Sequence, residues 1–542
     1  MNAPAFAPAA DRRNALDRAH IGDIEGALGT VRAFDTGPRV TSRRKLATLL
    51  AVLGPGVVVM VADHDAGTIS VFAQAGQNHG MRLLWVLLVL CPALYVTQEM
   101  VARLGAVTGS GHARLTLERF GKLWCAFSLG DLMILNLATL VTEFIGVALA
   151  LSYFGVPRYV SAPAAAILLV AMTATGSFRR WERAMCVMIA ANLTLIPLAV
   201  TSHPRAASVA AGFVPAVGNG AAGSTVLLLV ALVGTTIAPW QLFFQQSNVV
   251  DKRITPRWLR YERADTAIGA VMFAACAGAV LILSATVAAA AGPHRPFTDA
   301  GAVAHAIGAH LGVGAGGVFA IALLNASLLG AGAVSLSGSY AIAEVFGVKH
   351  SLHRRVGDAR AFHASFAAIV ALAAGVVLVP GLPLGALTTL VQALAGILLP
   401  STLVLLLILC NDEQLLGPLT NGRALNAVGA VVVGSVLALS TLLTLTTVLP
   451  RMPFAIALAV TLALLLAAGV VLGASNVRHR RPPRAGASLT PWQRQTWTAP
   501  MLELVAPATP TRPRLLALAL LRAYVALIAG LLLLKLAGVL PG

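Results

Sequence analysis

Two aspartates, Asp63 and Asp65, lie two residues apart inside an apolar run, about 46–77, that is long enough to cross a membrane. A carboxylate at the centre of a bilayer costs several kcal/mol unless it is solvated or paired. No Lys or Arg stands beside Asp65 in the apolar run, so a bound cation is its simplest partner. Unwinding of the helix around Ala66 and Gly67 would also free backbone carbonyls to face that cation.

A second apolar run, about 223–248, carries the sequence GlyThrThrIleAlaProTrp at 234–240, near its middle. Gly and Pro at this depth indicate an interrupted helix that lines a cavity. An ordinary kink would explain Pro239 but would not explain the acids at 63 and 65. We therefore expect two broken helices whose breaks face each other.

The two breaks together offer an oxygen-rich set of ligands. Asp65 supplies a carboxylate, Thr68 a hydroxyl, and Gly234 or Thr235 a backbone carbonyl. Such a cage suits hard divalent cations that retain water, and Mg²⁺ is the main example.

Two neighbouring side chains have alternative roles. Asp63 is either a second acid of the site or of its approach, or a hydrogen-bond partner of the broken backbone. His64 is either a ligand or the partner of an adjacent acid, and imidazole prefers softer metals than this cage suggests.

The composition requires a membrane as the solvent of the chain. Of the 542 residues, 58% are hydrophobic and 11% charged, and the mean hydropathy is +0.82. A soluble domain of this size cannot bury so much apolar surface. Apolar segments follow one another at about 46–77, 81–105, 122–154, 159–176, 184–202, 223–248, 264–292, 311–346, 362–380, 383–410, 425–448, 452–474 and 513–540.

The basic residues predict the orientation of these segments. The net charge of +18 lies mostly in short loops, which argues for a topology signal and against nucleic-acid binding. The loops after the second, fourth, sixth, eighth and tenth segments are rich in Lys and Arg, and we expect them in the cytoplasm. They hold Arg103, Arg114, Arg119, Lys122, Arg179, Arg180, Arg183, Lys252, Arg253, Arg257, Arg260, Arg263, Lys349, Arg354, Arg355, Arg360 and Arg423. The opposite loops hold only Arg82, Arg158, Arg205, Arg295 and Arg451.

These patterns predict an all-α, polytopic membrane protein of the LeuT type, a 5+5 inverted repeat with broken helices 1 and 6. Residues 1–44 form a loosely structured cytoplasmic tail in this scheme. The two five-span repeats occupy 45–202 and 203–411, and spans 11 and 12 occupy 412–474. A basic cytoplasmic linker at 475–512, with its cluster at 478–484, leads to a thirteenth span at 513–542 and a periplasmic C-terminus.

Several ordered motifs resemble the NRAMP family of divalent-metal transporters over about 46–425. They are GlyProGly (54–56), AspHisAspAlaGlyThr (63–68), GlnAlaGly (74–76), LeuLeuTrpValLeuLeu (83–88), AlaArgLeuGlyAlaValThrGly (102–109), ThrGluPheIleGlyValAlaLeuAlaLeu (142–151), GlyThrThrIleAlaPro (234–239) and ValGlnAlaLeuAlaGlyIleLeuLeuPro (391–400). The resemblance implies a metal carrier of the bacterial inner membrane, with the ion as substrate and no resident cofactor.

The chain departs from the family pattern in ways that bear on selectivity. The family's Asp-Pro-Gly-Asn is Asp65, Ala66, Gly67 and Thr68 here, and its Met-Pro-His is Ala238, Pro239 and Trp240. A second family histidine is replaced by Gln245, and the proton-carrying aspartate of the third span by Leu140, whereas Glu143 is kept. Gln392 matches a glutamine that contributes to the family's site. The candidate ligands are thus Asp65, Thr68, Ala62, Gly234, Thr235, Ala238 and Gln392, with Asp63 and Glu143 on the pathway.

Loss of a thioether at Ala238 makes the site harder, because sulfur favours transition metals over Mg²⁺. The chain therefore looks most similar to the NRAMP-related magnesium transporters, with Mn²⁺ also accepted. Fewer titratable groups favour uptake driven by the membrane potential without protons. The alternatives are a proton-coupled Mn²⁺/Fe²⁺ importer, a sodium-coupled amino-acid symporter, and a channel or signalling protein. No catalytic or nucleotide motif suggests an enzyme, and the sequence does not fix the oligomeric state.

Overall fold

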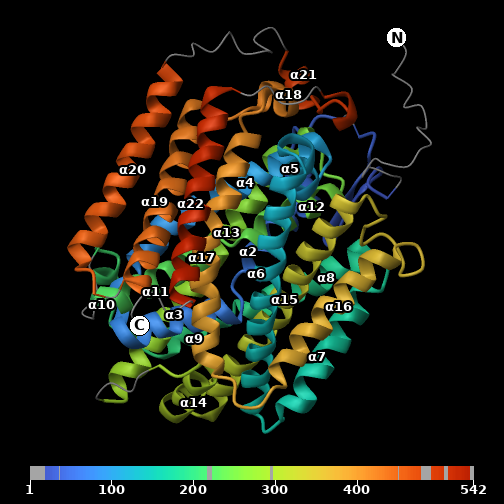
Figure 1. The fold of residues 1–542 in the computed structure, drawn as a ribbon. Coiled ribbons are helices and arrows are strands. Elements are labelled where there is room, and N and C mark those ends of the chain that lie inside the picture. The colour runs from blue at the N-terminus through green and yellow to red at the C-terminus, as the bar shows by residue number, and fades with distance from the viewer. Residues whose placement is uncertain are drawn as a thin grey trace.

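The computed structural model describes residues 19–35, 37–215, 222–292, 297–449, 451–477, 490–505 and 511–536. Within these ranges, nine helices are long and apolar enough to cross a membrane. A tenth span forms if the helices Ser42–Val52 and Pro55–Ala62, bent by 50° relative to each other, count as one. The expected all-α, polytopic membrane architecture is confirmed (Figure 1).

The first half of the chain has two short strands and a series of helices. They are β1 (Ile24–Gly26), β2 (Gly29–Val31), α1 (Ser42–Val52), α2 (Pro55–Ala62), α3 (Ala66–His79), η1 (Gly80–Leu83), α4 (Trp85–Thr108), α5 (His112–Phe120), α6 (Lys122–Ser152), α7 (Arg158–Thr173), α8 (Phe178–Asn192), α9 (Leu195–Thr201) and α10 (Ala206–Gly212).

The second half is helical throughout its described residues. Its elements are α11 (Ala222–Thr236), α12 (Pro239–Asp251), η2 (Pro256–Trp258), α13 (Leu259–Ala290), α14 (Ala300–Leu311), α15 (Val313–Phe346), α16 (Arg360–Val377), α17 (Leu384–Leu409), α18 (Glu413–Leu416), η3 (Gly417–Leu419), α19 (Arg423–Val448), α20 (Phe454–Val477), α21 (Pro491–Gln495), η4 (Leu502–Leu504) and α22 (Arg512–Leu536).

Each predicted apolar segment contains helix, but not every helix has the length of a span. The helix α7 and the apolar part of α20, Phe454–Gly469, have fewer than 18 residues, and α22 is not among the nine long apolar helices. The thirteen segments therefore correspond to about ten spans by length and hydropathy within the described part of the chain.

The first helix is broken where the sequence predicts it. Helix α2 ends at Ala62, and α3 begins at Ala66 with Asp65 as its N-cap in an extended conformation. The matching helix of the second half is interrupted at 237–238, between α11 and α12, with Ala238 extended and Pro239 in the first turn. Proline lacks a backbone N–H and is tolerated at the start of a helix, which explains why α12 begins there.

The N-terminal region differs from its expected loose structure. Strands β1 and β2 form an antiparallel hairpin that pairs Ile24 with Val31 and Gly26 with Gly29. Ile24 and Val31 are buried in the same apolar core as Ala51 and Val52 of α1. Residues 1–18 lie outside the described part. The prediction of a loosely structured tail is therefore wrong for the hairpin, because its apolar face packs against α1.

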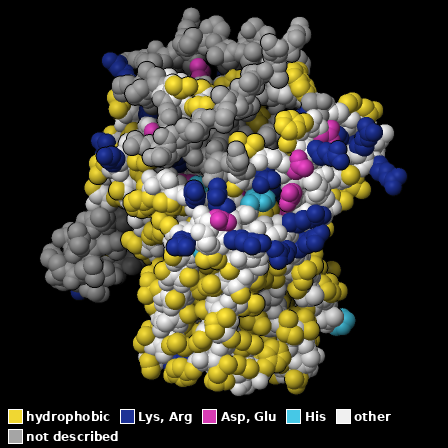
Figure 2. Space-filling model, turned by 90° about the vertical axis from the view of Figure 1, so that its right-hand side faces the viewer, with side chains coloured by type: hydrophobic (Ala, Val, Ile, Leu, Met, Phe, Trp, Pro, Cys, Tyr) yellow, Lys and Arg dark blue, Asp and Glu magenta, His cyan; other side chains and the backbone are white. Residues whose placement is uncertain are grey.

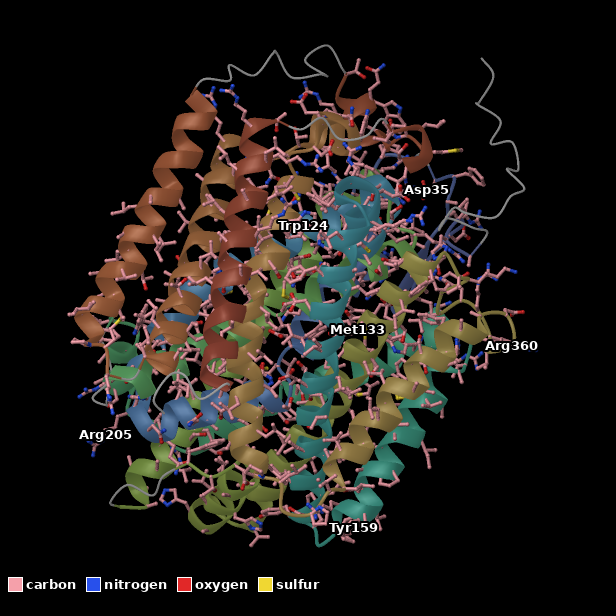
Figure 3. The ribbon with its side chains drawn as sticks, viewed as in Figure 1. Asp35, Trp124, Met133, Tyr159, Arg205 and Arg360 are labelled. Carbon is pink, nitrogen blue, oxygen red and sulfur yellow. The ribbon has the colours of Figure 1, made fainter. Side chains whose placement is uncertain are left out.

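One end of the helix bundle gathers most of the basic loops, and we call it the basic end. Side-chain contacts join these loops: Arg119 pairs with Asp412, Lys252 pairs with Glu182, and Arg257 lies over the Trp492 ring. Figure 2 shows Lys and Arg side chains as a band above a wide hydrophobic surface. Figure 3 places Asp35 at this end, with Tyr159 and Arg205 at the opposite end. Arg295 and the 478–484 cluster lie outside the described residues.

Polar side chains tie the helices together away from the breaks. Asn136 donates to the Val334 carbonyl, Ser401 donates to Asp131, and Asn325 donates to Asn192. Glu99 accepts from Arg103 at 3.2 Å, as its i,i+4 spacing predicts, and also pairs with Arg263.

We expect stability to fall in acid because of His112 of α5, which lies outside the spans and is fully buried. Burial lowers the pKa of His112 to about 4, with Gln246 as its partner at 3.1 Å. The unfolded chain takes up this proton near pH 6.5, whereas the folded chain does so only near pH 4. The free energy of unfolding should therefore fall by about 3 kcal/mol between pH 7 and pH 4 on account of this group.

Thermal unfolding of the full chain in detergent, measured from pH 7 to pH 4, tests this expectation. His112→Gln should flatten the profile, and substitution of the exposed His310 by Gln serves as the control. An equally steep acid loss in His112→Gln would contradict the assignment.

Candidate functional site

The break in the first span brings Asp65 and Thr68 into direct contact. The Asp65 carboxylate accepts a hydrogen bond from the Thr68 backbone N–H at 2.8 Å, so it caps α3. An acid at a helix N-terminus is stabilised by the helix dipole and by the unpaired N–H groups there. This capping fixes the carboxylate at the point where the backbone leaves the helix, with 2% of the residue exposed.

The Thr68 hydroxyl bridges the two broken helices. It donates to the Asp63 carbonyl at 2.5 Å and lies 2.6 Å from the Thr235 hydroxyl. Either hydroxyl can be the donor in the contact between Thr68 and Thr235. The Thr235 carbonyl lies 3.3 Å from the same oxygen. Four oxygen atoms from both breaks thus converge beside Asp65.

Gln392 of α17 closes a third side of this group of oxygens. A Cβ added at Gly67 would lie 1.8 Å from the Gln392 amide nitrogen and 3.2 Å from an Asp65 carboxylate oxygen. That amide nitrogen is buried and has no hydrogen-bond partner among the described residues. Gly234 lies against the Gln392 carbonyl, where an added Cβ would be 2.2 Å away. Glycine at 67 and 234 therefore permits α3, α11 and α17 to meet at the site.

Glu143 of α6 lies on the other side of Asp65. Its carboxylate accepts from the Ala66 backbone N–H at 3.2 Å, and both this carboxylate and the Asp65 side chain lie against Gly330. Its other oxygen is buried without a hydrogen-bond partner among the described residues. The sequence places Glu143 on the transport pathway, and the structure joins it to the start of α3 at the break.

Asp63 belongs to a separate polar chain that sequence reasoning missed in part. The Gln241 side chain of α12 lies near the Asp63 carboxylate and donates to the Thr236 carbonyl at 3.4 Å, and Gln98 of α4 donates to Gln241 at 2.8 Å. Asp63, Gln241 and Gln98 are at most 1% exposed. The signal for Gln241 was an uncharged amide just after a helix break, at a depth where polar side chains are costly.

Close helix packing around Asp65 and Glu143 depends on Gly330 of α15. A Cβ added there would lie 2.8 Å from the Asp65 Cβ and 3.0 Å from a Glu143 carboxylate oxygen. Gly146 similarly admits Ala66 and Ser327, each within 2.4 Å of an added Cβ. Glycines on α15 and α6 thus allow these two helices to lie close to the broken span.

Three residues considered from the sequence are not joined to this group by the contacts described above. Ala62 and Ala238 stand at the two breaks, where they end α2 and precede α12. His64 turns away: its ring is fully buried and packs edge-on to Phe273 of α13, 6.3 Å between centroids. The expectation that His64 pairs with a neighbouring acid is therefore wrong, because the break rotates its side chain toward α13.

The described residues contain no group of three or more His, Cys, Asp or Glu side chains arranged to hold a metal ion. The oxygens beside Asp65 come instead from backbone carbonyls, two hydroxyls and an amide. Such a set offers weak, replaceable ligands around one buried carboxyl pair, a chemistry suited to transient cation binding.

Broken helices at matching positions, with a buried polar group between them, define the class of the protein: it is a LeuT-type membrane transporter rather than an enzyme. The family model described as natural resistance-associated macrophage protein-like matches residues 56–446. The chain belongs to this Nramp family.

Individual relatives agree with this assignment. The chain is 28% identical over 398 residues to "Divalent metal cation transporter MntH" of Ralstonia nicotianae, which covers 70% of this chain and 87% of that protein. It is 26% identical over 436 residues to the protein of the same name from Deinococcus radiodurans, and the match covers 77% of this chain and 93% of that protein. A crystal structure of a manganese transporter from Eremococcus coleocola has a TM-score of 0.63 at 19% identity and covers 96% of this chain and 99% of the other, which shows the same fold.

Proposed function

We propose that this protein carries a divalent metal cation, with Mn²⁺ as a substrate, into the cell across the bacterial cytoplasmic membrane. The observation that carries the proposal is the buried Asp65 carboxylate at the break, beside oxygens of Thr68 and Thr235. Family membership supports the divalent cation, and the names of the relatives support manganese. The proposed ligands are Asp65, Thr68, Thr235 and Gln392, with carbonyls near Ala62, Gly234 and Ala238.

The contact between Asp65 and Glu143 favours proton coupling over the uncoupled uptake expected from the sequence. Two carboxyl groups buried this close together repel each other when both are ionised, so one of them is expected to carry a proton while no cation is bound. A divalent cation that binds Asp65 would repel that proton, and Glu143 offers a place from which it can leave. Leu140 removes one titratable group of the family pattern, but Glu143 supplies another on the same helix.

Proteoliposomes that contain the full chain and a pH-sensitive dye test this proposal. We expect Mn²⁺ uptake that is accompanied by internal acidification when the external pH is low. Metal uptake without any change of internal pH would contradict proton coupling and support the uncoupled alternative. Absence of Mn²⁺ transport altogether, with Mg²⁺ carried instead, would overturn the choice of ion.

Mg²⁺ remains a second candidate substrate because of one specific residue. Ala238 brings no sulfur to the break, and an oxygen-only site accepts hard ions. The magnesium-transporter branch is therefore kept as the alternative identity, to be judged by the same uptake assay.

Ala238→Met should raise uptake of Cd²⁺ and Mn²⁺ relative to Mg²⁺ by about tenfold, because a thioether binds soft ions better. Competition assays in proteoliposomes measure the ratio. Ile237→Met, which puts the same side chain at the neighbouring buried position, is the matched control. Equal shifts in the two variants would contradict a place for Ala238 beside the ion.

The orientation is likewise part of the proposal. The excess of Lys and Arg at the basic end supports a cytoplasmic N-terminus and basic end, with the C-terminus in the periplasm. The division into repeats at 45–202 and 203–411, followed by spans 11 and 12 and the linker and last span, is proposed on the same pattern.

A further inference from the structure

The N-terminal hairpin, residues 19–35, packs against α1, the part of the first span that precedes α2 and the break. We propose that this hairpin is a latch that holds α1 and α2 against α8 and α12 and thereby keeps the basic end of the transport pathway closed. The inference rests on the proposed transport function only for its purpose, because the contacts themselves are independent of any ion.

The turn of the hairpin is fixed to α8 by two hydrogen bonds that join the Ala27 backbone to side chains of α8. The Ala27 N–H donates to the Glu182 carboxylate at 2.5 Å, and Arg183 donates to the Ala27 carbonyl at 3.2 Å. Ala27 is 5% exposed and Glu182 is fully buried. Hydrogen bonds to charged groups contribute more than neutral ones, so this is a strong attachment for a two-residue turn.

The start of the hairpin is fixed to the end of α12. Arg253 donates to the Ala19 carbonyl at 2.9 Å and to the Asp23 carbonyl at 3.0 Å. Arg253 adopts a φ of 66°, a left-handed conformation that is unusual for a residue other than glycine. The guanidinium lies directly over Gly22, where an added Cβ would be 2.9 Å away.

The hairpin also lies against the junction of α1 and α2. A Cβ added at Gly26 would be 2.1 Å from the Ala51 carbonyl oxygen and 3.3 Å from the Lys252 ammonium nitrogen. Lys252 itself donates to the carbonyls of Val52 and Leu53 and pairs with Glu182 at 2.6 Å. One buried ion pair thus connects the hairpin, the end of α1, α8 and α12.

Movement of this junction would reach the site directly. Asp65 follows α2 by three residues, and the start of α2 is held by Asp265 of α13, which accepts from the backbone N–H groups of Gly54, Gly56 and Val57. In transporters of this architecture, access alternates when one group of helices rocks against another. A hairpin that binds both groups opposes that motion until it is released.

Gly26→Val tests the latch, because its side chain would collide with the Ala51 carbonyl and displace the hairpin. Thr30→Val is the matched control, since Thr30 lies on the exposed face of β2. Each variant is made in the full chain with the five native cysteines changed to alanine and a reporter, Val59→Cys, on the buried α2. The rate at which a polar thiol reagent labels this cysteine is measured without metal.

We expect labelling to rise about tenfold in Gly26→Val, which corresponds to about 1.4 kcal/mol, and to be unchanged in Thr30→Val. A reporter on α3, Ile69→Cys, should not gain reactivity in either variant. Arg253→Ala, which removes the attachment at α12, should also raise labelling and serves if Gly26→Val does not fold. Unchanged labelling in Arg253→Ala or in folded Gly26→Val would overturn the latch, as would an equal rise in Thr30→Val.

The labelling result is separate from the proposed transport function. Faster labelling without Mn²⁺ or Mg²⁺ uptake would support the latch and contradict the transport proposal. Normal metal uptake with unchanged labelling would support the transport proposal and contradict the latch.

Discussion

Asp65→Ala is expected to reduce metal uptake by about a hundredfold while the protein folds and inserts normally. The carboxylate is the one charged oxygen at the centre of the oxygen group, and removal of a buried hydrogen-bonded charge partner typically costs 2–5 kcal/mol of binding. At about 1.4 kcal/mol per factor of ten, the loss in affinity alone spans about 30-fold to about 4,000-fold. Uptake of Mn²⁺ and Mg²⁺ into proteoliposomes measures the effect.

Asp63→Asn provides the comparison for Asp65→Ala. Asp63 is equally buried, but its carboxylate lies near Gln241 rather than Thr68. We expect a smaller loss in this variant, because its amide keeps a polar group beside Gln241. Elution of each variant as a single peak from size exclusion confirms that it has folded. Substantial metal uptake by a well-folded Asp65→Ala would remove the basis of the proposed site.

Lys252→Ala should lower the free energy of unfolding by about 3–5 kcal/mol. The ammonium and the Glu182 carboxylate are both fully buried, 2.6 Å apart. Removal of one partner leaves the other charge buried and uncompensated, which is the costly case for an interior ion pair. Two carbonyls at the end of α1, of Val52 and Leu53, also lose their donor.

Thermal unfolding of the full chain in detergent measures this loss, and the exposed Lys349→Ala is the control. The double variant Lys252→Met with Glu182→Met should recover part of the stability, because it leaves no isolated charge. A Lys252→Ala variant as stable as Lys349→Ala would contradict the prediction. It would show that water or another cationic group compensates the Glu182 carboxylate.

The broken helices and their site could be predicted because rare residues mark them. Acids at 63 and 65, Gly67 and Pro239 are costly in a continuous lipid-facing helix, so each carries local information. The contact between Thr68 and Thr235, from breaks far apart in the sequence, followed from the inverted repeat. The direction of a side chain at the break could not be predicted from the sequence, because the irregular backbone there turns His64 toward α13.

Partners set by packing between helices could not be predicted from single segments. Glu143 meets Asp65 because Gly330 and Gly146 allow α15, α6 and α3 to approach closely, and a sequence does not state which glycines face each other. The hairpin was missed for a different reason. Its strands have three residues each, too few for an alternating pattern to be recognised, and their stability comes from contact with α1.

Glycines at 67, 146, 234 and 330 leave no room for a side chain of their own, so neighbouring helices lie close together around the acid pair. The dimensions of the proposed ion site therefore depend on the distances between whole helices as well as on the side chains that line it. Amino-acid changes on the lipid-facing sides of α15 or α17 that alter those distances should shift which ionic radius is preferred, although they touch no ligand. Ion selectivity in such a protein can therefore change through substitutions on its lipid-facing surface. The lateral pressure of the membrane then becomes one of the determinants of ion selectivity.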